Sequence, residues 1–311
     1  MVFFGRLCRA VLVAGAVTVA GLATSSPVSE PLAPPHRAIT VGSGSLRLRA
    51  VRAGAGPVVV LLHGFGESLL AWQGVFDRLS READVVALDL PGFGSSSKPR
   101  TGYSTDSLAW AVLRAMDTLD IRRAVLVGHS MGGAVAAAVS VAAPDRVRGL
   151  AMIDPAVVSA PWLREAGATS ERNRDLVRRG IAGYEALRMR FAGAHDPAWL
   201  AESDSALAYS PATDADYVTA LQAVLREFDF FYISPERARR LQLPIIILWG
   251  EYDLTVSVEL GRALANALPT SEFHVVDRSW HRPHIERPAE VAGLIAGFLR
   301  RLPDLQSPGD H

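Results

Sequence analysis

The chain has 311 residues, of which 49% are hydrophobic and 21% are charged, and its 32 Lys and Arg residues balance its 32 Asp and Glu residues. This composition is that of an ordinary globular protein, with a core large enough to fold without disulfides. Zero net charge, with no basic stretch that is interleaved with aromatic residues, excludes nucleic acid from the expected partners.

The first 25 residues have the pattern of an export signal. Arg6 and Arg9 precede an uncharged, largely apolar run over 10–23, and small and polar residues follow. This run is short for a membrane span but suits the core of a signal peptide. We therefore expect residues 1–25 to direct export to the periplasm or the medium. The alternative is an uncleaved N-terminal anchor, and only that anchor would hold the protein at a membrane.

Residues 26–38 contain four prolines and are expected to form an extended linker. From residue 39 onwards, short apolar segments alternate with amphipathic ones. Strands are predicted at 39–41, 46–51, 57–62, 84–89, 125–127 and 146–154. Helices are predicted between them at 68–79, 105–119 and 134–143, the second with Thr105 as its N-cap. This alternation is typical of a mostly parallel central β-sheet with helices on both faces.

The alternation stops after Asp154. Residues 156–240 contain no buried strand but several amphipathic segments, such as 172–191 and 214–230, so we expect a helical cap to be inserted here. Strand patterns return at 243–250 and 272–277, and a last helix is predicted at 288–301. The predicted organisation is a signal or anchor (1–25), a linker (26–38), a core in two pieces (39–155 and 241–303), a helical cap between these pieces (156–240) and a short tail (304–311).

Ser130 lies in the segment GHSMGG, between a predicted strand and a predicted helix. Its small neighbours Gly128 and Gly132 permit the sharp, strained strand-to-helix turn on which a nucleophilic serine can be exposed. The alternative is a glycine-rich turn that carries an ordinary surface serine. A base, an acid and donors for an oxyanion elsewhere in the chain would favour the nucleophile.

The base and the acid are found after later strands. Sites in parallel sheets form at the carboxyl ends of the strands, and Asp253 and His281 follow two of them. A serine hydroxyl needs a base, and the base needs a carboxylate that orients it. The order Ser130, Asp253, His281 supplies all three groups. Asp154 is the backup acid, and His284 is the alternative base.

The oxyanion donors are expected from two backbone N–H groups. One belongs to Met131, directly after the nucleophile, and the other to Phe65, in the loop after the segment VVVLLHG. His63 and His129 flank the site and are expected to shape its loops. Asp277, only four residues before the base, is expected to order the loop there.

No metal or cofactor is expected. The spacing of His281 and His284 suits a metal-binding pair, but no third ligand cluster accompanies them in the sequence. The segment GFGSSS over 92–97 lacks the lysine and the helix start of a phosphate-binding loop.

Five motifs together resemble the cap-bearing α/β-hydrolases, a family that includes esterases, lipases, cofactor-free haloperoxidases and epoxide hydrolases. The motifs are LLHGFGES, LDLPGFGSSSKP, VGHSMGG, WGEYDLTV and HRPHIERPAEV, and the resemblance extends over residues 39–301. The chain departs from the usual pattern at two points. Trp280 stands before His281 where a glycine is usual, and Val256 stands near the acid where a proline is frequent.

The resemblance implies hydrolysis of a neutral carboxylic ester, with a short to medium apolar acyl chain, through an acyl-enzyme on Ser130. Epoxide opening would require an aspartate as the nucleophile, and the segment HGFGES lacks the extra Gly-Pro-Gly that is usual in similar C–C bond hydrolases. The alternatives are a catalytically slow ligand-binding relative, an acyltransferase, and haloperoxidase-like activity at the same site. The sequence indicates neither the acyl length nor the oligomeric state.

Overall fold

The structure, a computed structural model, describes most of the predicted core. The described residues are 37–43, 46–156, 215–229, 232–233, 235–253, 255–268 and 270–303. The predicted signal or anchor, nearly all of the linker, most of the cap and the tail lie outside them. No helix in the described part of the chain is long and apolar enough to cross a membrane.

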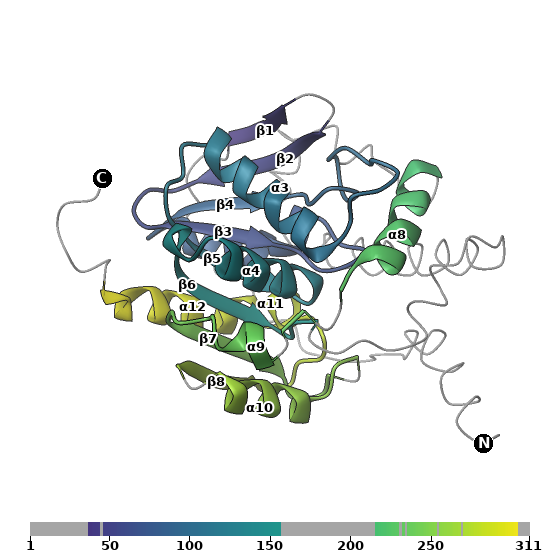
Figure 1. Ribbon diagram of the computed structural model, residues 1–311. Helices are drawn as coiled ribbons and strands as arrows, with labels where there is room; N and C mark the ends of the chain where they lie inside the picture. The colour runs from purple at the N-terminus through teal and green to yellow at the C-terminus, as the bar shows by residue number, and fades with distance from the viewer. Residues whose placement is uncertain are drawn as a thin grey trace, which may run out of the picture.

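Eight strands of the described residues form one sheet in the order β1-β2-β4-β3-β5-β6-β7-β8 (Figure 1). β2 pairs antiparallel with β1 and β4, and all the other neighbours are parallel. The strands are β1 (Arg37–Ser43), β2 (Leu46–Ala53), β3 (Val58–Leu62), β4 (Asp84–Leu88), β5 (Ala124–His129), β6 (Val147–Ile153), β7 (Ile245–Gly250) and β8 (Ser271–Val276). The predicted mostly parallel sheet is confirmed, and every predicted strand is present.

The central strands are apolar on both faces, which is why they form a covered parallel sheet. In β3, Val60 and Leu62 face one hydrophobic cluster while Val59 and Leu61 face the other. All four side chains are fully buried. A strand with this pattern is stable only when helices cover both of its sides.

The helices lie in two layers, one on each face of the sheet (Figure 1). One layer consists of α3 (Thr105–Thr118), α4 (Met131–Ala142) and α10 (Val258–Ala267), which contribute to the cluster around Leu62. Helix α8 (Ala215–Glu227) contributes to the same cluster but lies beyond the ends of the strands (Figure 1). The other layer contributes to the cluster around Leu61 through α2 (Gln73–Leu79) and α12 (Pro288–Arg301). The shorter helices are η1 (Leu69–Trp72), η2 (Pro144–Arg146), α9 (Pro235–Ala238) and α11 (Pro283–Glu286).

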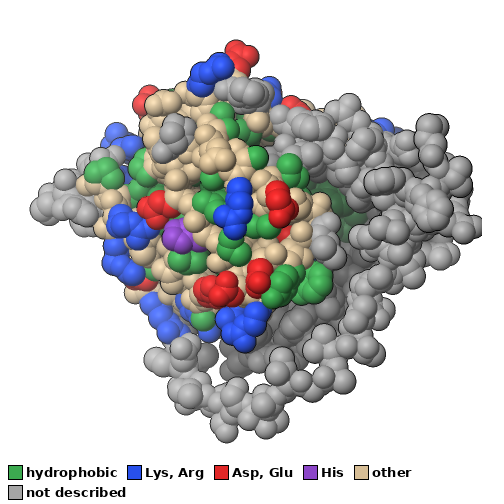
Figure 2. Space-filling view, turned by 90° about the horizontal axis from the view of Figure 1, so that it is seen from below, with side chains coloured by type: hydrophobic (Ala, Val, Ile, Leu, Met, Phe, Trp, Pro, Cys, Tyr) green, Lys and Arg blue, Asp and Glu red, His purple; other side chains and the backbone are tan. Residues whose placement is uncertain are grey.

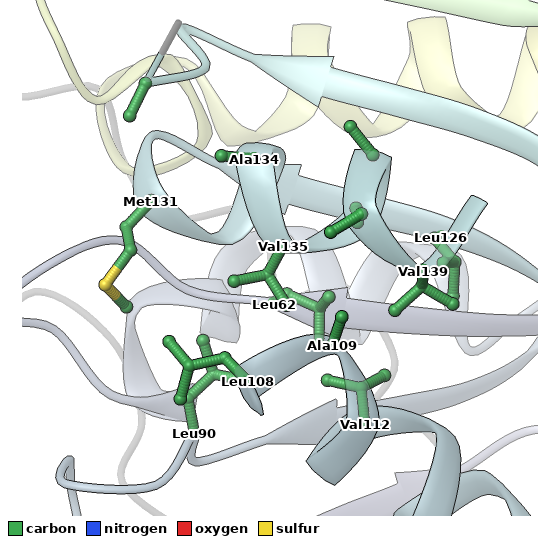
Figure 3. Packing of buried hydrophobic residues seen from close by; sticks show 14 of the residues in the cluster. Leu62, Leu90, Leu108, Ala109, Val112, Leu126, Met131, Ala134, Val135 and Val139 are labelled. Atoms are coloured by element: carbon green, nitrogen blue, oxygen red, sulfur yellow. The ribbon is translucent and has the colours of Figure 1, made fainter. Parts of the chain in front are cut away.

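Helix α4 is enclosed between the sheet and α3. Figure 3 shows Val135 and Val139 of α4 close to Ala109 and Val112 of α3, and these four side chains are buried. The small alanines of α4 let its backbone approach its neighbours closely. At its first turn, a Cβ atom on Gly132 would collide with the carbonyl oxygens of the residues that end β3. The start of α4 is therefore fixed against the carboxyl end of β3.

Three helix predictions are corrected by the structure. The N-cap of α3 is Ser104, whose hydroxyl accepts a hydrogen bond from the backbone N–H of Ser107 at 3.1 Å, and Thr105 is the first helical residue. Helix α4 begins at Met131 rather than at residue 134, because its two glycines fit the close contact with the sheet. Helix α10 has no predicted counterpart, although its apolar residues recur at helical spacing.

The described part of the predicted cap is mainly α8. Glu227 at its end accepts hydrogen bonds from the backbone N–H groups of Gly102 and Tyr103, both at 2.9 Å. Tyr217, in its first turn, is buried and packs its ring edge-to-face on Phe93, with centroids 6.2 Å apart. These contacts fix α8 to the loop that leads into α3.

Charged side chains of both signs mix on the surface near β8. Figure 2 shows the molecule from below, where Lys and Arg side chains lie between Asp and Glu side chains. On the edge strand β8, Glu272 forms an ion pair of 2.6 Å with Arg301 of α12. Charged residues on an edge strand disfavour pairing with another chain.

A glycine substitution tests the contact between α4 and β3. We predict that Gly132→Ala lowers the free energy of unfolding by about 1–3 kcal/mol, because the added methyl group meets backbone that cannot rotate away. Gly293→Ala in α12 is the matched control, since a Cβ atom there meets nothing within 4 Å. It should stabilise the protein by about 0.5–1 kcal/mol. Urea unfolding curves compare the two, and equal midpoints would contradict the prediction.

Candidate active site

The turn at Ser130 holds a strained backbone. Ser130 has φ 49° and ψ −115°, in a region that residues with a side chain rarely adopt. Four hydrogen bonds enforce it: its N–H donates to Ile153 at 2.9 Å, and its carbonyl accepts from Gly133 at 3.0 Å, Ala134 at 3.3 Å and Ala156 at 2.9 Å. Anchored by β6 and α4 in this way, Ser130 stands at the carboxyl end of β5.

The structure brings Ser130, His281 and Asp253 together. Nε2 of His281 lies 3.1 Å from Oγ of Ser130, and Nδ1 lies 2.7 Å from Oδ2 of Asp253. Because the carboxylate accepts a hydrogen bond from Nδ1–H, Nε2 is left unprotonated and can accept the serine proton. The His281 side chain keeps 21% of its surface exposed, whereas that of Asp253 is fully buried.

Asp253 is held as a carboxylate by its donors. Its Oδ1 accepts the backbone N–H groups of Thr255 at 2.7 Å and Val256 at 3.0 Å. Burial acts to raise the pKa of Asp253, but the hydrogen bond from His281 and these two N–H groups outweigh burial and leave the pKa below its ordinary value. Val256 therefore has a definite part at this position, since a proline there would have no N–H to donate.

The pKa of His281 is also below its ordinary value. Burial is the main cause, and the hydrogen bond to Asp253 opposes it without cancelling it. The ring is therefore neutral at neutral pH and able to act as a base.

Asp154, the backup acid, takes a different position. It follows β6 with φ 41°, and its Oδ1 accepts the backbone N–H of Gly250 at 2.9 Å. Its other oxygen is buried and has no hydrogen-bond partner among the described residues. Burial and the negative charge of Asp253 raise the pKa of Asp154 well above its ordinary value, which favours the protonated, neutral carboxyl. It is Asp253, not Asp154, that accepts the hydrogen bond from His281.

The two expected oxyanion donors lie on elements that meet at Ser130. Met131 is the first residue of α4, where N–H groups have no partner within the helix. Phe65 follows the end of β3, and its ring packs on Phe93 with centroids 6.1 Å apart. His63 shapes this loop: its Nδ1 donates to the carbonyl of Gly64 at 2.8 Å, and its Nε2 accepts the N–H of Leu90 at 3.0 Å. The role of Phe65 and Met131 as oxyanion donors stays a prediction.

His284 does not contact Ser130. It is fully buried in α11, with its ring 4.6 Å from that of Trp72 and 4.3 Å from that of His129. Glu67, a residue that the sequence analysis did not select, lies against His129 at 3.0 Å. In the sequence, Glu67 is distinguished only as an acidic residue between two apolar segments, in the motif HGFGES.

Trp280 acts on the base through its backbone. Its ring is 52% exposed and packs edge-to-face on Tyr252, with centroids 5.9 Å apart. Its N–H donates to Glu286, and a Cβ atom at Gly250 would collide with its carbonyl oxygen. The loops after β7 and β8 are therefore packed directly on each other, which holds the acid beside the base.

Two clusters of the described residues have ligand atoms within 4.8 Å of one another, a spacing that could hold a metal ion: Glu67 with His129 and His284, and Asp154 with Asp253 and His281. In the first, Oε1 of Glu67 already pairs with the guanidinium of Arg282 at 3.1 Å. In the second, the oxygens of Asp253 are occupied by protein donors. Protein groups therefore already pair with Glu67 and Asp253, although one oxygen of Asp154 has no hydrogen-bond partner among the described residues, and we assign neither cluster as a metal site.

Comparisons with known proteins show the family of the chain. A sequence profile of the alpha/beta hydrolase fold family matches residues 57–288. The uncharacterized hydrolase YugF of Bacillus subtilis is 27% identical over 249 residues, which are 78% of this chain and 89% of that protein. A 2-hydroxy-6-oxo-6-(2'-aminophenyl)hexa-2,4-dienoic acid hydrolase of Metapseudomonas resinovorans is 28% identical over 278 residues, 85% of this chain and 91% of the relative.

The chain is also similar in fold to solved structures of this family. A thermophilic esterase from Thermogutta terrifontis superposes with a TM-score of 0.67 at 25% identity, over 86% of this chain and 99% of the esterase.

Labelling of Ser130 by a fluorophosphonate distinguishes the two acids. We predict that Asp253→Asn slows labelling by about 10³-fold or more, because the base loses the carboxylate that sets its tautomer. Asp154→Asn is the matched control, since an amide reproduces the neutral carboxyl, and labelling should slow by less than about tenfold. Mass spectrometry gives the site and the rate. Equal effects of the two changes would contradict this assignment.

Proposed function

Because this chain belongs to the α/β-hydrolase fold family and is an enzyme of the hydrolase class, we propose that it cleaves a neutral carboxylic ester through an acyl-enzyme on Ser130. The observation that carries the proposal is the hydrogen-bonded line from Oγ of Ser130 through His281 to Asp253. A nucleophile, a base and an acid in this order are what acyl transfer requires.

In the first step, Oγ of Ser130 attacks the ester carbonyl while Nε2 of His281 takes the hydroxyl proton. The protonated ring is stabilised by the carboxylate of Asp253 and then gives the proton to the departing alcohol. In the second step, His281 takes a proton from water, and the hydroxide attacks the acyl-enzyme. Ser130 is regenerated, and a carboxylic acid is released.

The oxyanion of each tetrahedral intermediate is bound by the N–H groups of Met131 and Phe65. Met131 begins α4, so the positive end of the helix dipole adds to its hydrogen bond. Gly132 fits against the carbonyl oxygens that end β3, which supports a short distance between the two loops that carry these donors.

The surroundings of Ser130 favour an uncharged, apolar acyl group. Phe65, Phe93 and Tyr217 form a chain of edge-to-face ring contacts that leads from the loop after β3 to α8. The nearby guanidinium of Arg282 is already paired with Glu67. A small apolar pocket gains about 0.8 kcal/mol for each buried methylene until it is full.

The relatives support hydrolysis but differ in substrate. The similarity to the esterase from Thermogutta terrifontis supports ester cleavage. The relative from Metapseudomonas resinovorans is instead a hydrolase of a hexadienoic acid. Transfer of the acyl group to an alcohol in place of water, and perhydrolysis, would both use the same acyl-enzyme. These reactions are therefore measured beside hydrolysis.

A panel of esters tests the proposed substrate class. We predict that the wild-type chain hydrolyses uncharged p-nitrophenyl esters with a maximum at a short or medium acyl chain, and that Ser130→Ala lowers kcat by about 10³-fold or more. The panel includes long-chain triglycerides and 2-hydroxy-6-oxohexa-2,4-dienoic acid. A rate that rises out to the triglycerides, or turnover of the dienoic acid alone, would contradict the proposal.

The pH dependence of kcat/KM tests the base. His281 must be neutral to take the serine proton, so kcat/KM rises with pH as this residue loses its own proton. Because burial holds the pKa of His281 below its ordinary value, we predict that the acid limb has its midpoint below about 6.5. The profile is measured with the best ester of the panel. A midpoint above this value would contradict the described environment of His281.

A further inference from the structure

A second cluster of buried ionisable side chains lies beside the nucleophile turn and has no part in the steps above. It consists of Glu67 before η1, His129 at the end of β5, Arg282 before α11 and His284 within α11. Glu67, His129 and His284 are each at most 2% exposed. A charge so deeply buried is strongly destabilising unless it is paired, so the partners of each group indicate its charge.

Glu67 is surrounded by donors. The backbone N–H of Gly64 donates to Oε2 at 2.8 Å, and Nε of Arg282 lies 3.1 Å from Oε1. Both oxygens of Glu67 thus face a donor that is independent of His129, and although burial acts to raise the pKa of Glu67, the positive groups around it hold the pKa well below its ordinary value. Glu67 is therefore a carboxylate, which can only accept hydrogen bonds. The 3.0 Å contact between its Oε2 and Nδ1 of His129 requires a proton on Nδ1.

The other ring nitrogen of His129 also faces an acceptor. Its Nε2 lies 2.6 Å from the backbone carbonyl oxygen of His281, and a carbonyl has no proton to give. Nε2 must therefore carry a proton as well. With hydrogen on both nitrogens the ring of His129 is an imidazolium, and Glu67 supplies the balancing charge.

We propose that His129, held as an imidazolium by Glu67, is a positioning residue for His281. This role rests on the proposed function, in which His281 is the base. The hydrogen bond to the carbonyl of His281 fixes the peptide that carries the base, and a peptide bond joins His129 to Ser130. One residue thus connects the nucleophile to a base that lies 151 positions away in the sequence.

The imidazolium also places a positive charge beside the base. The ring centroids of His129 and His281 are 5.0 Å apart. After burial, the charge of His129 is the next cause that lowers the pKa of His281; the hydrogen bond to Asp253 and the negative charges of Asp253 and, last, Glu67 oppose both. The protonated base that forms in the first step is therefore a stronger acid toward the departing alcohol. Asp253 stabilises that proton, and His129 keeps it transferable.

Other ionisable groups face His129, and they bear on any titration. Burial holds the pKa of His284 well below its ordinary value, so this ring is neutral and adds no charge. The guanidinium of Arg282 pairs with Glu67 at 3.1 Å. The groups that face His129 come from the end of β3, the turn before η1, the loop after β8 and α11: His63, Glu67, His281, Arg282, His284 and Glu286.

The charge of His129 is measured directly by ¹⁵N NMR of the full chain with ¹⁵N-labelled imidazoles. Loss of one set of signals in His129→Gln assigns the ring. Because both ring nitrogens face acceptors, we expect both nitrogens of His129 to be protonated at neutral pH. A ring with one unprotonated nitrogen at neutral pH overturns the proposal. The measurement needs no substrate, so its result is independent of whether the chain cleaves esters.

Glu67→Gln tests the role in positioning, because it removes the balancing charge and keeps the shape. We expect His129 to become neutral, the labelling rate of Ser130 by a fluorophosphonate to fall about 10–100-fold, and the acid limb of that rate to move to higher pH. A merely structural role would lower stability without moving the acid limb, and that result overturns the proposal. If the variant does not fold, the NMR measurement on the unaltered chain decides.

Asp84→Asn is the matched control. It breaks a partly buried ion pair of 2.6 Å with Arg52. This pair lies at the amino end of β4, whereas Ser130 lies at the carboxyl end of β5. We expect an unchanged acid limb, and a shift equal to that of Glu67→Gln overturns the proposal. Absence of labelling of Ser130 in the unaltered chain would refute the proposed function, whereas the NMR result would still decide the charge of His129.

Discussion

The site depends on a serine backbone held at a φ of 49°, which its neighbours have to enforce. The N–H of Ser130 is bound by β6, its carbonyl by α4 and by the chain just beyond Asp154, and the turn has no freedom to relax. Since β5 and β6 are parallel, the same bonds that enforce this turn bring Asp154 to the same edge of the sheet. The strain at Ser130 is therefore compensated by the sheet as a whole rather than by its own turn.

Burial alone does not decide the charge of the carboxyls around the site. Asp154, Asp253 and Glu67 are all at most 5% exposed, and burial acts to raise the pKa of each. Asp253 and Glu67 remain ionised because N–H donors or positive charges surround them. Asp154 has a single backbone donor and a negative neighbour, so its pKa is raised and its protonated form is favoured. The donors and charges around each carboxyl thus favour the ionised form of Asp253 and Glu67 and the neutral form of Asp154, although all three lie close to Ser130 or His129.

Most of the sheet, and the three side chains proposed for acyl transfer, could be predicted from the sequence. Ser130, Asp253 and His281 stand in short motifs directly after strands, and parallel strands end at one edge, so local patterns were sufficient to bring them together. Contacts between distant segments could not be found in this way. Glu67 meets a histidine 62 positions away, and no periodicity in either segment indicates that pair.

Local propensity also failed where tertiary contacts decide. The two glycines that open α4 argue against helix on their own, but the contact with β3 leaves no space for a side chain. Ser104 and Thr105 can both cap a helix, and only the extended backbone of Ser104 makes it the N-cap of α3.

His281, the proposed base, follows a strand at one edge of the sheet. His281 follows β8, an edge strand that pairs only with β7 and has a single fully buried residue, Val276. Edge strands open at a lower free-energy cost than central ones, while the core stays folded. Opening of β8 would separate the base from a nucleophile that is still held in its strained turn. Thermal inactivation of this protein and melting of its core are then two different events, and the first precedes the second.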